Sequence, residues 1–269
     1  MIQTESPLRN RPEMHPAMRP AGNNIITIAS GKGGVGKTVL AVSLTQALAN
    51  AGKKVLLFDG DVGLANVDIQ LGLMPELDLA TVISGEMSLH DVIFRCDAGG
   101  FDLIAGRSGS GSLGSLGVSQ LREIRQDLAL LGAEYDYIIL DLGAGIDDAV
   151  KTLSSGLGPK LVITTGDPTS LTDAYAYIKV TTQTAPEADV RILINMAKSE
   201  AEGLKIYDKL LSACRNFLQI EPPLAVIIEQ DEKVSNAIRA QMGLMTRFPT
   251  SRAAGAADDL ARYIIRGTA

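Results

Sequence analysis

A glycine-rich stretch with two lysines carries the residue types best suited to chemistry. Residues 31–38 run Gly-Lys-Gly-Gly-Val-Gly-Lys-Thr and fit the pattern G-x-x-x-x-G-K-[ST]. Glycines let the backbone curl so that its N–H groups face phosphate oxygens, while Lys37 reaches the β and γ phosphates and the Thr38 hydroxyl coordinates Mg²⁺. The pattern therefore predicts that phosphates are held by Gly33, Gly34, Val35, Gly36, Lys37 and Thr38.

The segments on either side of this loop provide the setting that the pattern requires. Residues 25–29 form an apolar run typical of a buried strand, and residues 38–50 carry apolar side chains at helical spacing. A helix that begins at the loop presents the positive end of its dipole to the same anion. We therefore predict a strand–loop–helix unit that binds a nucleoside triphosphate with Mg²⁺.

Two further apolar runs end in aspartates. One leads to Asp59 and Asp61, and the other leads to Asp141 in an arrangement typical of the Walker B pattern. The carboxyl ends of parallel strands meet at the ligand-binding edge of a sheet, so these carboxylates should lie beside the phosphates. Asp141 would hold Mg²⁺ through a coordinated water, and the Gly143 N–H would face the γ phosphate. The simpler interpretation is that the aspartates are polar residues at the turns after strands.

Apolar runs and helical patterns alternate along most of the chain. The runs occupy residues 25–29, 55–58, 137–140, 161–164, 190–194 and 224–228, and the helical patterns occupy residues 38–50, 118–131, 169–184, 203–217 and 231–242. Apolar strands separated by helices indicate a parallel sheet that is buried on both faces. The predicted fold is a doubly wound α/β domain over residues 25–269, with a mainly parallel sheet flanked by helices. Residues 1–24 contain four prolines and no periodicity, which predicts a flexible tail.

The composition narrows the possible partners and locations. The formal net charge is −6 and the isoelectric point is near 5.0, which argues against a surface built to hold nucleic acid. Cys96 and Cys214 stand far apart and are expected to be buried thiols of a reducing compartment. No apolar run approaches the roughly 20 residues that a membrane helix needs, so we expect a cytoplasmic protein.

The loop sequence as a whole resembles the deviant Walker A motif of the MinD/ParA (SIMIBI) class of ATPases. The resemblance implies a P-loop ATPase of MinD-like fold that uses ATP and Mg²⁺ and hydrolyses ATP slowly. It also implies that Lys32 crosses to the ATP of a second subunit, which makes homodimer formation ATP-dependent. In this class, the residue at the place of Asp61 positions the attacking water, and the one at Asp59 lies near the metal and Lys32. Without the resemblance, Lys32 would be interpreted as a solvated loop cation.

Later segments resemble one branch of this class, the FlhG/FleN regulators of flagellar number. Residues 59–68 resemble their first switch segment, and residues 195–203 resemble their Asn-Met-x-x-Ser-x-x-Glu-Gly. The resemblance implies that the Asn195 amide reads adenine and that Asp231 lies near the base. It also implies protein partners among flagellar regulators or basal-body components, and a polar or transiently membrane-associated location. The alternative within the class is a ParA-like ATPase that positions DNA or another cargo.

Several features depart from those relatives. Leu142 replaces the Ser or Thr that usually follows the Walker B Asp, and Glu229 replaces Pro in a segment resembling Ile-Pro-x-Asp-x-x-Val. These two changes leave open a nucleotide-binding scaffold that does not hydrolyse ATP. The final helical pattern, at residues 256–265, is predicted to pack on the core and does not support membrane contact. Residues 6–9 are Ser-Pro-Leu-Arg, where FlhG proteins often carry a helix that stimulates a partner GTPase.

DNA binding would have to depend on arginines near the C-terminus, whose spacing gives them no obvious common face: Arg239, Arg247, Arg252, Arg262 and Arg266. We therefore expect no nucleic-acid partner. Residues 106–114 are rich in glycine and serine and are predicted to be a plain surface loop, with a partner surface as the alternative.

Overall fold

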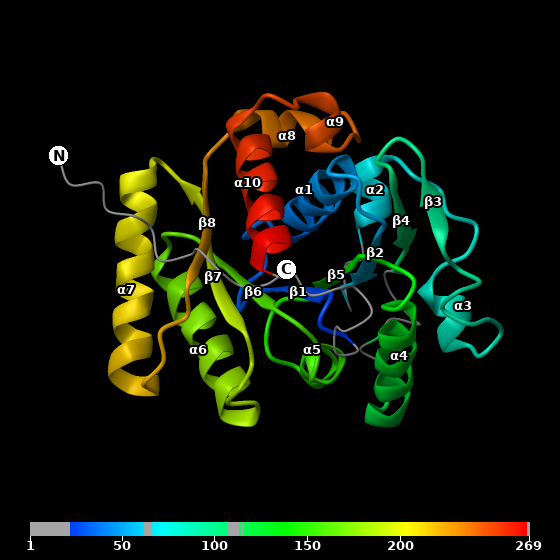
Figure 1. The fold of residues 1–269 in the computed structure, drawn as a ribbon, viewed down its shortest axis with the longest axis horizontal. Helices are drawn as coiled ribbons and strands as arrows, with labels where there is room; N and C mark the ends of the chain where they lie inside the picture. Colours follow the sequence, from blue (N-terminus) through cyan, green and yellow to red (C-terminus); the bar gives the residue numbers. More distant parts are fainter. Residues whose placement is uncertain (1–21, 62–65, 107–112, 114–115, 268–269) are drawn as a thin grey trace.

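A twisted sheet with helices on both faces makes up the computed structural model, which describes residues 22–61, 66–106, 113 and 116–267 (Figure 1). Within these residues the strand order is β3-β4-β2-β5-β1-β6-β7-β8. All neighbouring strands are parallel except β3 and β4, which form an antiparallel pair at one edge. The strands are β1 (Ile25–Ala29), β2 (Val55–Gly60), β3 (Phe94–Cys96), β4 (Phe101–Ile104), β5 (Tyr137–Leu142), β6 (Lys160–Thr164), β7 (Val190–Ala197) and β8 (Leu224–Glu229).

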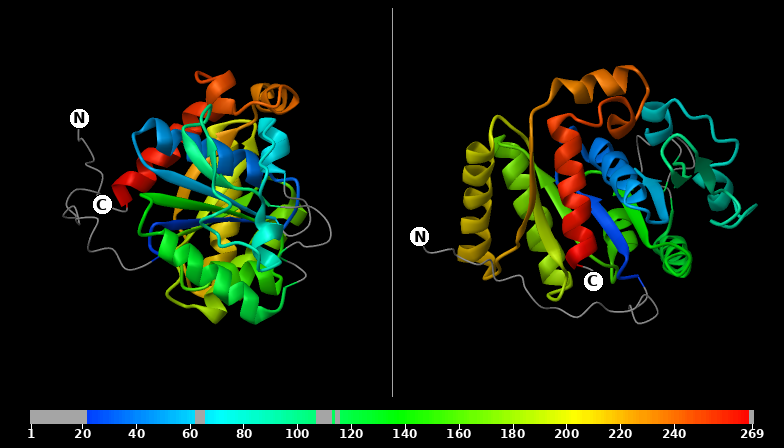
Figure 2. Two further views of the ribbon diagram at one scale, coloured as in Figure 1. Left: turned by 90° about the vertical axis from the view of Figure 1, so that its right-hand side faces the viewer. Right: turned by 45° about the horizontal axis from the view of Figure 1, so that its top comes forward.

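The helices form one layer on each side of the sheet (Figures 1 and 2). They are α1 (Lys37–Asn50), α2 (Val67–Leu71), α3 (Leu79–Ile83), α4 (Val118–Leu131), α5 (Asp148–Ser154), α6 (Pro168–Thr184), α7 (Glu200–Leu218), α8 (Glu232–Arg239), α9 (Leu244–Arg247) and α10 (Arg252–Gly267). Successive strand residues point to opposite faces. Ile26 and Ile28 of β1 therefore join the core under α1 and α10, whereas Ile25 and Ala29 join the core under α4 to α7. The predicted doubly wound, mainly parallel fold is confirmed.

Four of the predicted strands continue past their predicted ends: β2, β5, β7 and β8. β2 and β5 each extend by two residues, so Asp59 and Asp141 lie in paired strands rather than in the turns that follow. The register places Asp59 opposite Asp141 and Gly60 opposite Leu142. A Cβ on Gly60 would lie 2.8 Å from Leu142 Cδ2, so glycine at this place leaves room for the leucine in the core.

The helix predicted over residues 231–242 is shorter than expected. It ends at Arg239, and Gln241 then adopts a left-handed backbone conformation with φ of 52°. A non-glycine residue rarely adopts this conformation, and it cannot continue an α-helix. The chain therefore turns and begins the separate short helix α9 after Gly243.

The final helix is longer than predicted but packs as predicted. It begins at Arg252 rather than at residue 256, and it buries Leu260 and Ile264 in the core against α1 and β8. The interpretation of this helix as a packing element is confirmed. Within the described part of the chain, no helix combines the length and apolar character needed to cross a membrane.

The first described residues are already packed against the domain. Asn24 is buried, and its side-chain N–H groups donate to the carbonyl oxygens of Gly132 and Tyr135 at 2.7 and 2.8 Å. Residues 1–21 of the predicted tail, and most of the loop predicted at residues 106–114, lie outside the described residues.

The two cysteines are buried free thiols, as expected. Burial raises the pKa of Cys96 above its usual value and raises that of Cys214 to about 11. Both side chains therefore stay protonated at neutral pH and act as small apolar packing groups.

Candidate functional site

The predicted phosphate loop connects β1 to α1. Gly34 and Gly36 have φ of 77° and 94°, a left-handed backbone that glycine adopts at little cost. Gly36 is the N-cap of α1, and no described side chain caps its first turn, so the amide N–H groups there are left to face a ligand. Lys37, the first residue of α1, is buried beside the loop. This geometry fits a chain of phosphates.

The loop forms one side of a cavity of about 990 Å³. That volume is in the range of small-molecule sites, which run from about 300 to 1,000 Å³. Four predicted residues from separate segments line the cavity together with the loop: Asp61, Gly143, Asn195 and Asp231. Other walls are residues that sequence alone assigns to a core or a helix surface, because nothing in their type signals a ligand: Ile69, Ile238, Leu244, Ala253 and Ala257.

Asp59 and Asp141 lie opposite each other in β2 and β5, and both are almost fully buried. Burial and the charge of Asp141 raise the pKa of Asp59 to about 7. Asp59 Oδ2 accepts the backbone N–H groups of Asn66 and Val67, both at 3.0 Å. Asp59 therefore anchors the start of α2 on the sheet.

Asp141 differs from Asp59 because neither of its carboxylate oxygens accepts a well-aligned hydrogen bond from the described residues, although the Thr38 hydroxyl lies close enough to lower its pKa. Burial raises the pKa of Asp141 to about 6, although the nearby Thr38 hydroxyl and Lys37 charge oppose the rise. A buried carboxylate without donors is destabilising unless a cation binds it. Asp141 is therefore a candidate ligand for a bound cation.

This arrangement fits the predicted Mg²⁺. Mg²⁺ is bound by oxygen atoms, commonly one or two carboxylates together with substrate phosphates rather than an all-protein cage. The Asp141 carboxylate and the Thr38 hydroxyl supply such oxygens beside the phosphate loop. The described residues contain no group of three His, Cys, Asp or Glu side chains able to hold a metal on their own.

Asp61 lines the cavity and follows Asp59 by two residues. Its backbone N–H is 3.4 Å from Asp59 Oδ1, and its negative charge contributes to the raised pKa of Asp141. The structure therefore brings the three predicted aspartates together. The water-positioning role of Asp61 and the metal role of Asp59 stay predictions. Residues 62–65 of the predicted switch segment lie outside the described residues.

The Lys32 side chain is directed to a neighbouring helix rather than to the large cavity. Its Nζ donates to Thr169 Oγ1, on α6, at 2.8 Å. Lys32 lines an adjoining cavity of about 450 Å³, whose other charged residues are Asp167, Lys198 and Glu202. The two cavities share the lining residues Gly33, Gly34, Met196 and Gln230. Among the described residues, those lining the 990 Å³ cavity do not include Lys32. The phosphate cradle of one chain is therefore formed without this lysine.

Asn195 contacts the phosphate loop. β7 runs to Ala197, so Asn195 lies inside this strand and not after its end at residue 194, as the sequence suggested. Its Nδ2 donates to the Val35 carbonyl oxygen at 2.7 Å, and a Cβ on Gly36 would lie only 2.5 Å from the same nitrogen. The amide therefore braces the loop and requires glycine at residue 36. Its contact with adenine stays a prediction.

Asp231 lines the cavity and also joins two helices. Its Oδ1 accepts the Lys233 N–H at 2.9 Å, and its Oδ2 accepts the Ala253 N–H at 3.2 Å. Burial raises the pKa of Asp231, but these N–H bonds and the Arg252 charge outweigh that effect and hold the pKa below its usual value. The predicted contact of Asp231 with the nucleotide stays a prediction. Leu142, in contrast, is buried in the core and does not line the cavity.

Comparison with known proteins agrees with this geometry. The family model described as CobQ/CobB/MinD/ParA nucleotide binding domain matches residues 26–244. The antiactivator FleN of Pseudomonas aeruginosa is 37% identical over 240 residues, which cover 89% of this chain and 83% of FleN. The flagellum site-determining protein YlxH of Helicobacter pylori is 30% identical over 242 residues, which cover 89% of this chain and 81% of YlxH. Among solved structures, the cell division ATPase MinD of Pyrococcus furiosus has a TM-score of 0.76 at 25% identity, covering 90% of this chain and 98% of that one.

Proposed function

The chain belongs to the CobQ/CobB/MinD/ParA nucleotide-binding family, and on this basis we propose that it is a switch that dimerises on ATP and returns to the monomer after hydrolysis. It is an ATPase that uses ATP and Mg²⁺. The observation that carries the proposal is the position of Lys32, whose side chain contacts α6 and lines the 450 Å³ cavity instead of the nucleotide cavity. A lysine so placed is available to a second subunit.

The residues of one chain suffice to bind ATP. Loop N–H groups and Lys37 hold the phosphates, and Asp141 and Thr38 hold Mg²⁺, which offsets phosphate charge during phosphoryl transfer. Asp61, which lines the cavity, orients the attacking water. Lys32 of a second copy adds a positive charge that stabilises the transition state. Hydrolysis is therefore slow in the monomer and needs the dimer.

The relatives suggest what the switch controls. FleN is named as an antiactivator, and YlxH is named as a flagellum site-determining protein. We propose that this chain likewise regulates the number and placement of flagella, acting at a cell pole through protein partners among flagellar regulators or basal-body components. The alignments with FleN and YlxH support this role, because each covers 89% of the chain, at 37% and 30% identity.

A DNA-positioning role finds less support. Two of the five candidate arginines are engaged in ion pairs, Arg252 with Glu229 at 2.8 Å and Arg262 with Asp259 at 2.6 Å. The net charge of −6 also disfavours nonspecific DNA binding. Likeness to ParA ATPases near 20% identity supports only the shared fold.

Size-exclusion chromatography with light scattering tests the switch. In Mg-ATP, Asp61→Ala is expected to accumulate as a dimer because it binds ATP without hydrolysing it, whereas Lys32→Ala is expected to stay a monomer. If both variants stay monomeric, the proposed switch is refuted. Deleting the gene and counting flagella per cell tests the cellular role, and an unchanged count would argue for a different cargo.

A further inference from the structure

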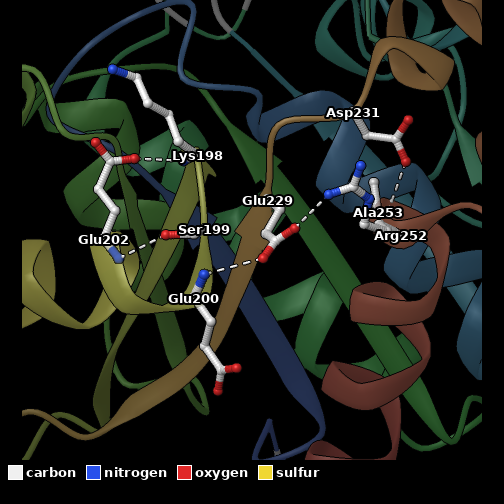
Figure 3. Close-up of polar contacts among 8 residues, drawn as sticks. All are labelled: Lys198, Ser199, Glu200, Glu202, Glu229, Asp231, Arg252 and Ala253. Carbon is white, nitrogen blue, oxygen red and sulfur yellow. Dashed lines mark hydrogen bonds and ion pairs between the residues drawn. The ribbon is translucent and has the colours of Figure 1, made fainter.

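Glu229, the last residue of β8, joins the beginnings of two helices (Figure 3). Its Oε1 accepts the backbone N–H of Glu200, the first residue of α7, at 3.1 Å. Its Oε2 lies 2.8 Å from Nη1 of Arg252, the first residue of α10. One side chain thus ties α7 and α10 to the end of the sheet.

The two residues that follow are fastened in the same region. The Gln230 N–H donates to the Ala197 carbonyl oxygen at the end of β7, at 2.8 Å. Asp231 joins the first turns of α8 and α10 because it accepts the N–H groups of Lys233 and Ala253. Figure 3 shows its contact with Ala253. Residues 229–231 therefore form a short strip held to the ends of three helices and one strand.

This strip is a wall of the nucleotide cavity. Glu229, Gln230 and Asp231 all line it, as do Ala253 and Ala257 of α10. The phosphate loop, residues 33–38, supplies a different wall, so phosphates held there leave the nucleoside to the remaining surfaces. The strip and the start of α10 therefore belong to the surfaces that remain for the nucleoside.

Electrostatics explains why a carboxylate suits residue 229. A helix N-terminus is a positive pole, so a negative group is favoured there and a cation is disfavoured. Arg252 is a cation at such a pole, and Glu229 offsets it while also accepting an N–H at the start of α7. The Glu229 side chain is 28% exposed and that of Arg252 is 75% exposed, so the carboxylate is the more firmly packed member of the pair.

From these contacts we infer that Glu229 is a positioning residue for the nucleoside of ATP, acting through Gln230 and the first turn of α10. The inference rests on the proposed ATP switch. It assigns a role to a residue that the sequence marks only as a departure from Pro. A side chain that supports this wall should govern affinity for the base and ribose, and should leave the affinity of the loop for phosphates unchanged.

Paired affinity measurements test this role. Dissociation constants for Mg-ATP and for inorganic tripolyphosphate are measured by competition against a fluorescent ATP analogue. Glu229→Ala is expected to raise the dissociation constant for ATP about tenfold, because one pair of charge-assisted contacts is lost. The dissociation constant for tripolyphosphate should stay within about twofold of the wild-type value. Glu229→Gln is expected to weaken ATP less, because the amide oxygen still accepts the Glu200 N–H. Arg252→Lys should keep near wild-type affinity for ATP, whereas Arg252→Ala should raise the dissociation constant for ATP about threefold.

Glu202→Ala is the matched control. Its carboxylate also accepts a backbone N–H beside the start of α7, that of Lys198, but Glu202 lines the 450 Å³ cavity and not the nucleotide cavity. This variant should be less stable than the wild type, but it should not lose affinity for ATP selectively over tripolyphosphate. The inference is overturned if Glu229→Ala binds ATP as the wild type does, or if it loses affinity for ATP and tripolyphosphate equally. If the alanine variant does not fold, Glu229→Gln is judged by the same two outcomes. A wild-type protein that binds no ATP would refute the proposed function instead.

Discussion

Asp141→Asn should stabilise the ligand-free protein at alkaline pH. The carboxylate is buried and accepts no well-aligned hydrogen bond from the described residues. Its pKa is raised to about 6 from the ordinary 3.8, and this difference corresponds to about 3 kcal/mol against the charged form in the folded state. An amide of the same shape removes that charge. The free energy of unfolding at pH 8 is therefore expected to rise by up to about 3 kcal/mol in the variant.

The pH dependence gives the sign of the effect. Above pH 6 the Asp141 carboxylate is charged in both the folded and the unfolded chain, so the folded state carries the whole penalty. Between pH 8 and pH 5 the folded state takes up a proton that the unfolded state, with its lower pKa, does not. The wild type should therefore gain about 1.4 kcal/mol of stability relative to the variant over this interval.

Urea unfolding at pH 5, 6, 7 and 8, without nucleotide and with a chelator, measures this difference. Mg-ATP supplies the control condition: the wild type should become the more stable protein, because the amide of the Asp141→Asn variant no longer offers a carboxylate to Mg²⁺. The reasoning fails if the variant is less stable than the wild type at pH 8 without ligands. It also fails if the difference between the two proteins does not change with pH.

Three further substitutions have outcomes that follow from single contacts. Gly36→Ala places a Cβ 2.5 Å from Asn195 Nδ2 at φ of 94°, so it should lower the melting temperature and abolish ATP binding measured by calorimetry. Asn195→Ala removes the donor to the Val35 carbonyl oxygen, so in the same titration it should weaken the binding of ATP and of tripolyphosphate, each by about five- to tenfold. A loss of affinity confined to ATP would instead indicate the adenine contact predicted from the sequence. Leu142→Thr should destabilise the core by about 3 kcal/mol in urea unfolding, without raising the rate of phosphate release, because this side chain packs at Gly60 and not in the cavity; a faster ATPase would show that Leu142 limits hydrolysis.

Local patterns account for what the sequence predicted well. The phosphate loop is a run of eight residues whose glycines, lysine and threonine act through the local backbone, and the strands before Asp59 and Asp141 are continuous apolar runs. Long buried strands and a contiguous loop leave few alternative structures, so the fold and the group of aspartates followed from the sequence.

Short elements were missed because they carry little pattern. β3 has three residues, and α2 and α3 have five each, fewer than two turns. In the region predicted as one helix over residues 231–242, Ile238 and Met242 have helical spacing, yet both are partly exposed and the helix has ended before Met242. Helical spacing of apolar residues does not by itself show which of their side chains are buried in the core.

Contacts between segments far apart in the chain could not be predicted from the sequence either. Asn195 and Val35 are 160 residues apart, and Glu229 meets Glu200 and Arg252 from two directions. The sequence marks Glu229 only as an unexpected residue. Its partners become visible once the sheet order brings the ends of β7 and β8 together.

The most direct test of the central claim mixes two inactive variants. Lys32→Ala lacks the lysine, and Asp61→Ala lacks the residue proposed to orient water, so neither should release phosphate from ATP alone. In a mixed dimer, the Lys32→Ala chain keeps its own Asp61 and receives Lys32 from the Asp61→Ala chain, which completes one of the two sites. Because Asp61→Ala is expected to pair with itself and Lys32→Ala is not, the mixed dimer is isolated with a different affinity tag on each chain. It should hydrolyse ATP at about half the wild-type rate per dimer, since one of its two sites is complete. A mixed dimer as inactive as its components would contradict the claim, because a lysine acting within its own chain completes neither site.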